Sequence, residues 1–439
     1  MLETIRNAWK VKEIRNKILF TILIILIFRI GSVIPVPFID IGVMKESFQA
    51  LAEAGKDNQF FNYLTVITGG GLEYGAIFAM SVTPYINASI IVQLLCVAIP
   101  IFERWQKEGE EGQKKLAQVT RCATVILALI QGIAFFLYLK NGGSDPSIRT
   151  YLSVTKPGET WFAGFVIVLA FTAGSALVMW LGEQIDNKGI GNGISILLFA
   201  GILSRGPQAF AALWTYFVKY KEYVAVIGIV IGFLLIIAFV VWMTAAERRI
   251  PIQYAKRVVG NKMYGGQNTH IPIKVNMSGV MPIIFASSIL MVPTMIIGFA
   301  PKLQNIWVGK ILAEFAKQGL TYAIIYFILI IGFAYFYATI QFNPVEMANN
   351  LRKNGGAIPG IRPGNPTSDF ISKILSRITL LGAIFLSVIA IIPIIIGSVG
   401  HINVSLGGTS VLIMVGVALD IVKNLESQMM MRHYKGFLD

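Results

Sequence analysis

The feature that most constrains this chain is a set of ten long apolar stretches separated by polar or charged segments. Each has about 20 residues, the length at which a helix crosses a bilayer core of about 30 Å. In lipid only helices and closed barrels bond all of their backbone groups, and these runs exceed the roughly 10-residue strands of a barrel. We therefore predict an all-α membrane protein with ten transmembrane helices. The predicted spans lie near 18–34, 74–101, 119–139, 161–181, 193–213, 223–244, 277–298, 320–341, 374–397 and 409–427.

Composition leads to the same class. Hydrophobic residues make up 55% of the 439 residues and charged residues 14%, more apolar side chain than a water-facing surface tolerates. We interpret the first stretch as a permanent span and not as a signal peptide, because residues 33–37 offer no small-residue cleavage site. Two cysteines, Cys96 and Cys122, and three scattered histidines indicate neither a disulfide framework nor a metal site.

The distribution of Lys and Arg predicts the orientation. Ten spans put both termini on one side, and if that side is the cytosol, the inward segments hold 25 of the 37 Lys and Arg residues. Cytosolic loops of membrane proteins are generally enriched in these residues. We therefore predict that the N and C termini are cytosolic.

Two inward segments, 245–274 and 342–372, are unusually long and basic, and the first holds a single acidic residue, Glu247. Charge alone leaves two interpretations open. One is the general positive-inside bias, and the other is a docking surface for a polyanion whose phosphates are neutralised by Lys and Arg. The basic residues concerned are Arg248, Arg249, Lys256, Arg257, Lys262, Lys274, Arg352, Lys353 and Arg362.

A short apolar segment precedes the second span. Residues 60–67 are too few to cross a bilayer, and three consecutive glycines, Gly69, Gly70 and Gly71, follow Thr68. Non-helical backbone at membrane depth is tolerated only where protein buries it or a cavity hydrates it. The segment is therefore either a half-helix beside a cavity or an amphipathic external loop.

Polar residues inside or at the edge of spans are the next informative feature. Asn87, Gln131 and Asn276 are expected to face other helices, either as simple helix–helix contacts or as a polar switch between mobile helices. Arg29, in the first span, is costly at that depth, and we expect it to have a structural partner.

Catalytic motifs are missing from the sequence: it contains no Walker-type phosphate loop, no H-E-x-x-H motif and no nucleophile–base set. We predict that the chain is not an enzyme and needs no cofactor. Two functional classes then stay open, a passive channel and a secondary solute transporter with inverted repeats.

Six sequence strings distributed along the whole chain resemble the SecY family of bacterial protein-export channels. They are FRIGSVIPVP (28–37), TPYINASIIVQLL (83–95), KEGEEGQKKLAQ (107–118), MWLGEQIDNKGIGNGISILLFAGI (179–202), YAKRVVG (254–260) and GIRPG (360–364). The chain departs from the family pattern at Val82, where isoleucine is common, and at Asn261, where many relatives have a basic residue.

The resemblance implies two inverted halves, 1–222 and 223–439, around an hourglass-shaped pore. The implied ring of aliphatic side chains that constricts the pore is Val82, Ile86, Ile194, Leu198, Ile284 and Ile413. The implied plug covers residues 61–72 and includes Phe61, Leu64, Ile67, Gly69, Gly70 and Gly71. The implied lateral gate, which responds to signal sequences, has the polar residues Asn87, Gln131 and Asn276.

The resemblance also implies the setting and the partners. The chain would lie in the bacterial plasma membrane, pass unfolded preproteins to the outside and release apolar segments sideways into lipid. Its expected partners are the small subunits SecE and SecG, the motor ATPase SecA, the ribosome, preprotein signal sequences and membrane lipid. The positions carried over for SecA or ribosome binding are Arg248, Arg249, Lys256, Arg257 and Arg362.

Overall fold

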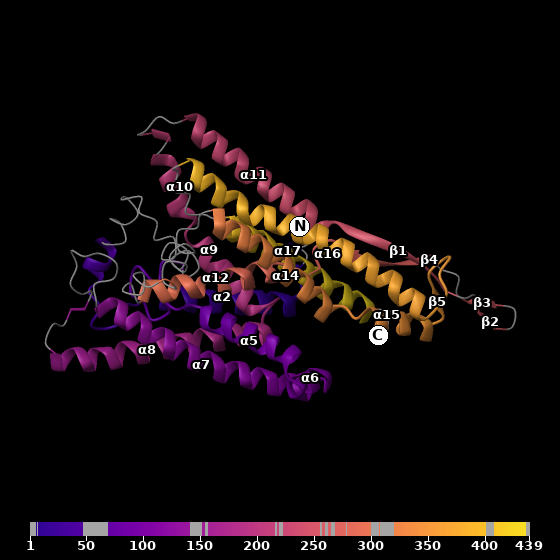
Figure 1. The fold of residues 1–439 in the computed structure, drawn as a ribbon, viewed down its shortest axis with the longest axis horizontal. Coiled ribbons are helices and arrows are strands. Elements are labelled where there is room, and N and C mark those ends of the chain that lie inside the picture. Colours follow the sequence, from indigo (N-terminus) through magenta and orange to yellow (C-terminus); the bar gives the residue numbers. More distant parts are fainter. Residues whose placement is uncertain are drawn as a thin grey trace.

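The computed structural model shows a bundle of long helices that run roughly along one axis (Figure 1). It describes residues 6, 8–46, 69–140, 152–153, 157–215, 217–218, 223–254, 257–259, 262–264, 268–277, 279–299, 307, 320–400 and 408–435. Within them, the helices of the first part of the chain are α2 (Lys12–Gly31), α5 (Thr83–Ala98), α6 (Pro100–Lys107), α7 (Glu110–Lys140), α8 (Pro157–Lys188), α9 (Gly193–Leu203) and α10 (Gly206–Thr215). Those of the second part are α11 (Tyr223–Ala245), α12 (Met281–Phe299), α14 (Leu320–Gln341), α15 (Pro344–Lys353), α16 (Asn365–Gly400) and α17 (Gly408–Lys435).

Each of the ten predicted spans therefore contains helix, and the second and fifth differ from the prediction in shape. The second helix begins at Thr83 and not at 74, because Gly75 and Ser81 both have left-handed backbone, with φ of 53° and 49°. It ends before Pro100, and the next helix, α6, turns away by 100°. Pro100 lacks an N–H and disfavours helical backbone at Ile99, which explains the break. In the fifth span, α9 and α10 are separated by a turn after Leu203.

The helices differ in whether their length and composition suffice to cross a membrane. Among the described residues, six helices are long and apolar enough to cross a membrane by themselves, and the bent pair α5–α6 makes seven. Helix α12 has a shorter apolar part, Met281–Leu290. Helices α2 and α17 have charged residues within their apolar stretches, Arg29 in the first and Asp420 and Lys423 in the second.

Strands occur in the long basic segments, where no secondary structure was predicted. They are β1 (Glu247–Tyr254), β2 (Arg257–Val259), β3 (Lys262–Tyr264), β4 (Asn268–Lys274) and β5 (Gly356–Ala357). The order β4-β1-β5 forms one antiparallel sheet, in which Ile250 pairs with Ile271, and β2 pairs with β3. The alternation in Ile250-Pro251-Ile252, with both isoleucines buried, is the period-two pattern of a half-buried strand. Figure 1 shows these strands and α15 toward one end of the molecule.

The hydrophobic core is divided along the sequence. One cluster draws only on residues 36–171, and a second draws only on residues 233–419. A third cluster combines residues of both parts, with Phe28 and Phe78 from the first and Val417 from the second. A fourth, built around Ile250, joins the sheet to α15 and α16. The third cluster is thus one place where the two parts of the chain meet.

Candidate functional site

The six aliphatic residues of the expected ring lie in this third cluster. Val82, Leu198 and Ile413 are fully buried in it, and Ile86, Ile194 and Ile284 pack against it half-buried. They come from four places in the fold: the start of α5, helix α9, helix α12 and helix α17. Aliphatic contacts are non-directional, so such a cluster can separate and close again without breaking hydrogen bonds. The structure therefore brings all six together, and their role as a constriction stays a prediction.

A tight turn between α8 and α9 positions two of the ring residues. The Asn192 side chain caps α9 by accepting from the Ser195 N–H at 3.0 Å, and the Gly193 N–H donates to Asp186 Oδ1 at 2.7 Å. A Cβ atom on Gly193 would lie 2.0 Å from the carbonyl oxygen of Gly182, so only glycine fits at this helix crossing. Ile194 follows directly.

The expected gate residues come from α5, α7 and the segment that leads into α12, and these helices touch across the two parts of the chain. Asn87 is half-buried on α5, Gln131 is buried on α7, and Asn276 is buried between β4 and α12. Helix α12 packs against both α5 and α7. The carboxamide oxygen of Asn276 has no hydrogen-bond partner among the described residues, and no hydrogen bond joins the three side chains there. A buried acceptor without a hydrogen-bond partner is destabilising.

A hydrogen bond across the same seam was not predicted. The Tyr337 hydroxyl on α14 donates to Gln93 Oε1 on α5 at 2.7 Å, and the Gln93 amide donates to Ser89 Oγ at 3.3 Å. The Tyr337 ring lies 5.1 Å from that of Phe285 on α12, measured between centroids. Gln93 is a polar residue in an apolar run, as Asn87 is, and that signal could have identified it.

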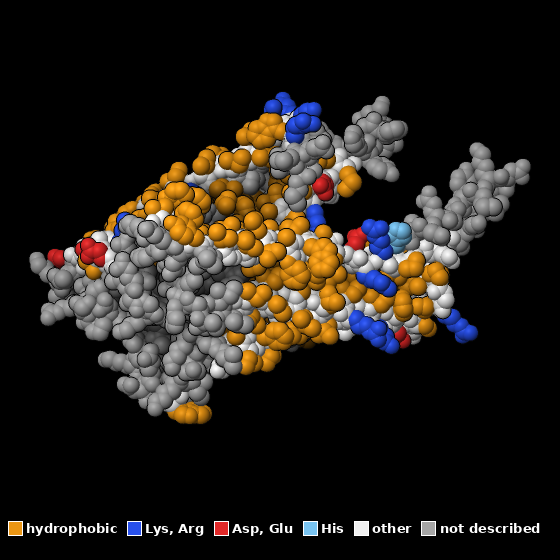
Figure 2. Space-filling model, turned by 90° about the horizontal axis from the view of Figure 1, so that it is seen from above, with side chains coloured by type: hydrophobic (Ala, Val, Ile, Leu, Met, Phe, Trp, Pro, Cys, Tyr) orange, Lys and Arg blue, Asp and Glu red, His pale blue; other side chains and the backbone are white. Residues whose placement is uncertain are grey.

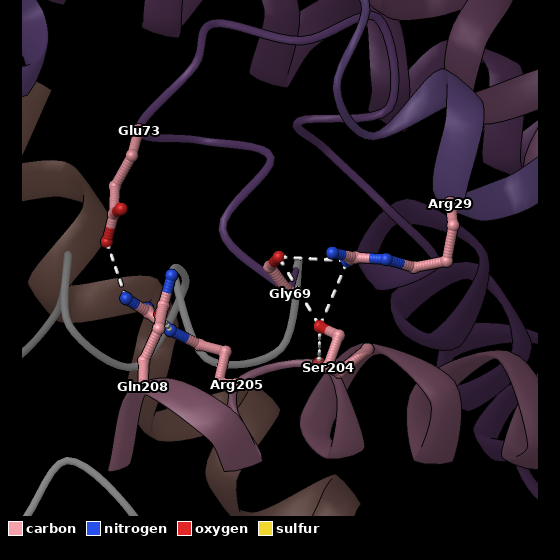
Figure 3. Close-up of polar contacts among 7 residues, drawn as sticks. Arg29, Gly69, Glu73, Ser204, Arg205 and Gln208 are labelled. Carbon is pink, nitrogen blue, oxygen red and sulfur yellow. Dashed lines mark hydrogen bonds and ion pairs between the residues drawn. The ribbon is translucent and has the colours of Figure 1, made fainter. Parts of the chain in front are cut away.

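The expected plug is described only at its end. Phe61, Leu64 and Ile67 lie outside the described residues, whereas Gly69, Gly70 and Gly71 form a turn in which the first two have left-handed φ of 62° and 90°. Around this turn lies a set of polar contacts (Figure 3).

The Arg29 side chain is at the centre of these contacts. Its Nη1 donates to the Gly69 carbonyl at 3.0 Å and to Ser204 Oγ at 2.9 Å, and next to it Arg205 Nη2 lies 2.6 Å from Glu73 Oε1. The expectation that Arg29 has a structural partner is confirmed.

The basic positions gather at one end of the molecule. Arg248 and Arg249 are exposed on β1, and Arg249 Nε is paired with Glu247 Oε1 at 2.8 Å. Arg362 is exposed beside Ile361, which packs against the cluster under the sheet. The backbone of Arg257 begins β2, and Lys256 lies outside the described residues. Figure 2 shows Lys and Arg side chains near this end and a broad hydrophobic surface over the helices.

Comparison with known proteins decides the family. The SecY profile matches residues 76–422. The chain is 42% identical over 448 residues to the protein translocase subunit SecY of Mycobacterium bovis, with all of both chains covered. The chain belongs to the SecY family. In fold it resembles a solved protein-conducting channel, with a TM-score of 0.63, 18% identity and coverage of 94% of this chain and 92% of the other. It also resembles Sec61 in the canine ribosome–channel complex from the endoplasmic reticulum, with a TM-score of 0.57, 17% identity and the same coverage.

SecY membership confirms several expectations. The chain is a multi-pass protein of the bacterial plasma membrane with ten transmembrane helices, so α2, α12 and α17 span as well. It is a protein-conducting channel and not an enzyme, which also decides against the secondary solute transporter. The roles of individual SecY residues in this chain, and the division at 222, stay predictions.

Proposed function

We propose that the chain passes unfolded preproteins through the ring formed by six aliphatic side chains, and releases sufficiently apolar segments sideways into lipid. The observation that carries this proposal is that all six belong to one hydrophobic cluster at the junction of the two parts of the chain. A ring of aliphatic groups excludes water and ions by dewetting when it is closed. It yields around a passing chain because its contacts have no preferred direction.

The proposed hinge runs between residues 1–222 and 223–439. Supporting this division, the two large clusters each draw on one half only, and the ring cluster draws on both. Moving the halves apart would therefore open the ring and leave each half's own core intact. Conformational change between packed bodies commonly follows such boundaries.

The proposed lateral exit lies between α12 and the pair α5 and α7. One polar interaction near this exit joins the two parts of the chain, the hydrogen bond from the Tyr337 hydroxyl on α14 to Gln93 on α5. The buried Asn276 oxygen, on the segment that leads into α12, has no hydrogen-bond partner among the described residues. An entering signal sequence would exchange helix–helix contacts for its own, at little net change in buried apolar area.

The proposed energy source is outside the chain, in SecA or the translating ribosome. Arg248, Arg249 and Arg362 are exposed on or beside one small sheet, which supports a common docking surface for an acidic or phosphate-rich partner. The resemblance in fold to a ribosome-bound Sec61 supports the ribosome as one such partner. SecE and SecG are proposed as its small subunits, and signal sequences and lipid as the ligands of the gate.

Reconstitution tests the proposal directly. The purified chain, with its SecE-type subunit, is incorporated into liposomes and supplied with SecA, ATP and a protease-sensitive preprotein. We expect ATP-dependent protection of the preprotein, and none when the signal sequence is deleted. Protection of the preprotein that needs neither SecA nor a signal sequence would contradict the proposed mechanism. So would a lack of protection in vesicles that contain the folded complex and active SecA.

A further inference from the structure

The contacts of Arg29 join three separate parts of the chain. Arg29 lies near the C-terminal end of α2, and its guanidinium donates to the Gly69 carbonyl and to Ser204 Oγ, the residue that caps α9. The Ser204 hydroxyl itself donates to the Gly201 carbonyl at 2.6 Å. Hydrogen bonds to a charged donor are shorter and stronger than neutral ones, and this one is half-buried.

Gly69 is shaped by this contact. Its φ is +62°, and a Cβ atom there would lie 2.7 Å from Ser204 Oγ and 2.8 Å from Arg29 Nη1. Both the backbone conformation and the close approach of the guanidinium therefore require glycine. The first of the three consecutive glycines thus fits a contact with α2 and α9.

An ion pair adds a second contact four residues later. Glu73 Oε1 and Arg205 Nη2 are 2.6 Å apart, with only 24% and 18% of their side chains exposed. Arg205 Nε also donates to Gln208 Oε1 at 3.2 Å, which orients the guanidinium (Figure 3). Reduced exposure weakens solvent screening, so this pair contributes more than a surface pair.

The rest of the segment between Gly69 and α5 is held by the end of α2 and by the residues that follow it. The Val36 N–H donates to the Gly75 carbonyl at 2.9 Å, and the Ile77 N–H donates to the Ile34 carbonyl at 3.0 Å. The Phe78 ring stacks on Phe28, with centroids 6.0 Å apart. The segment then delivers Val82 and Ile86 to the ring cluster.

We propose that Arg29, Ser204 and the Glu73–Arg205 pair form a polar anchor that positions Val82 and Ile86 against α9. Helix α9 carries one residue of the ring and ends at one residue of the anchor. Leu198 belongs to the ring, and the C-cap Ser204 lies six residues, or about 9 Å, further along the axis. The anchor and the ring are therefore two contacts between the same segment and the same helix. The anchor residues are positioning residues, and this inference rests on the proposed function of the ring.

Loss of the anchor is expected to loosen the closed ring without removing any ring side chain. E73R places two cations together, and R29Q removes the charged donor. In liposomes without SecA or preprotein, each is expected to raise resting ion leak about tenfold, which corresponds to about 1.4 kcal/mol less stabilisation of the closed state. The double variant E73R/R205E restores an opposite-charge pair and is expected to return the leak to within about twofold of the parent.

Two control variants make the result specific. R121E breaks the Arg121–Glu183 pair, which has the same 2.6 Å separation but joins α7 to α8, and it is expected to leave the leak unchanged. I86N removes a ring side chain and is expected to leak. If I86N leaks while E73R and R29Q stay tight, the polar anchor is wrong and the proposed ring stands. If I86N itself stays tight, the proposed function of the ring is wrong.

Folding is checked separately by monodisperse purification with the SecE-type subunit. If E73R does not assemble, E73Q takes its place, because it keeps the shape of the side chain and removes its charge. A tight E73Q channel, or a double variant that leaks as much as the single one, would overturn the anchor.

Discussion

Individual ring residues differ from other isoleucines of the same helices mainly in what they contact. Ile86 packs against the cluster shared by both halves, whereas Ile91, on the same helix, is 44% exposed on the outer surface. Spacing along the sequence does not distinguish them, since pairs four residues apart occur throughout the spans. A polar substitution at Ile86 should therefore have a different effect on the channel from the same substitution at Ile91.

Asparagine at Ile86 or Ile284 is expected to hydrate the closed ring. Because an amide retains water where an aliphatic group excludes it, resting ion leak should rise by about tenfold or more, and weaker signal sequences should be exported. Conductance in planar bilayers measures the leak. I91N, which places the same amide on the outer surface, is the matched control, and equal leak in all three variants would contradict the assignment.

Gly69 allows a prediction about stability. G69A places a methyl group in left-handed backbone against Arg29 and Ser204, so we expect a loss of about 1–3 kcal/mol in stability. Gly228, in α11, has open space within 4 Å of the position that a methyl group would take, and G228A should be neutral or stabilising by up to about 1 kcal/mol. Thermal unfolding in detergent compares the two variants. An unchanged melting temperature for G69A would contradict the requirement for glycine.

At the scale of helices, α5 contacts α14 through a hydrogen bond, and aromatic rings of α12 and α14 pack beside it. Tyr337 is the link, since its hydroxyl reaches α5 while its ring contacts Phe285 on α12. Hydrogen bonds between membrane helices contribute on average about 0.6 kcal/mol, small enough for a signal sequence to displace.

Y337F is therefore expected to ease lateral opening while it keeps the ring contacts. Loss of about 0.6 kcal/mol should shift the balance toward membrane insertion about threefold for a segment of borderline hydrophobicity. The ratio of inserted to translocated reporter measures this balance. Y335F is the control, because the Tyr335 hydroxyl donates to the Ser376 carbonyl on α16, within one half. An effect as large in Y335F would argue against the gate contact.

At the scale of the whole molecule, the basic segments and the channel lie at different places and are connected through α16. The sheet with Arg248 and Arg249 packs on α15 and on the start of α16, and α16 extends from there into the core of the second half. A partner that binds this sheet is therefore expected to shift the second half of the chain as one unit.

R362E is expected to slow SecA- or ribosome-driven transport about fivefold or more, with a stronger dependence on salt, because it reverses an exposed charge at the docking surface. Insertion, folding and resting conductance should be unchanged. Preprotein uptake at several salt concentrations measures the effect. K114E makes the same change of charge on α7, outside the sheet, and serves as the control. Normal transport in R362E would mean that the basic segment only sets the membrane orientation of the chain and does not bind a partner.

Much of the fold was predictable because it is local. Apolar runs of spanning length dictate helices wherever they occur, and Pro100 marks the break after α5. The alternating isoleucines around Pro251 and Pro272 also carried a strand signal, which the high charge of the segment obscured. The start of α5 was misplaced since left-handed backbone at Ser81 has no signal in an apolar sequence.

By itself, the sequence determined the membrane class, the helices and, through resemblance, which six aliphatic residues to expect at the ring. Only the tertiary structure decided that these residues share one cluster, that Arg29 bonds to Gly69 and Ser204, and that Tyr337 reaches Gln93. The physical reason is distance along the chain. Arg29 and Ser204 are 175 residues apart, and Gln93 and Tyr337 are 244 apart, so their contact depends on how whole helices pack and not on the residues that flank them.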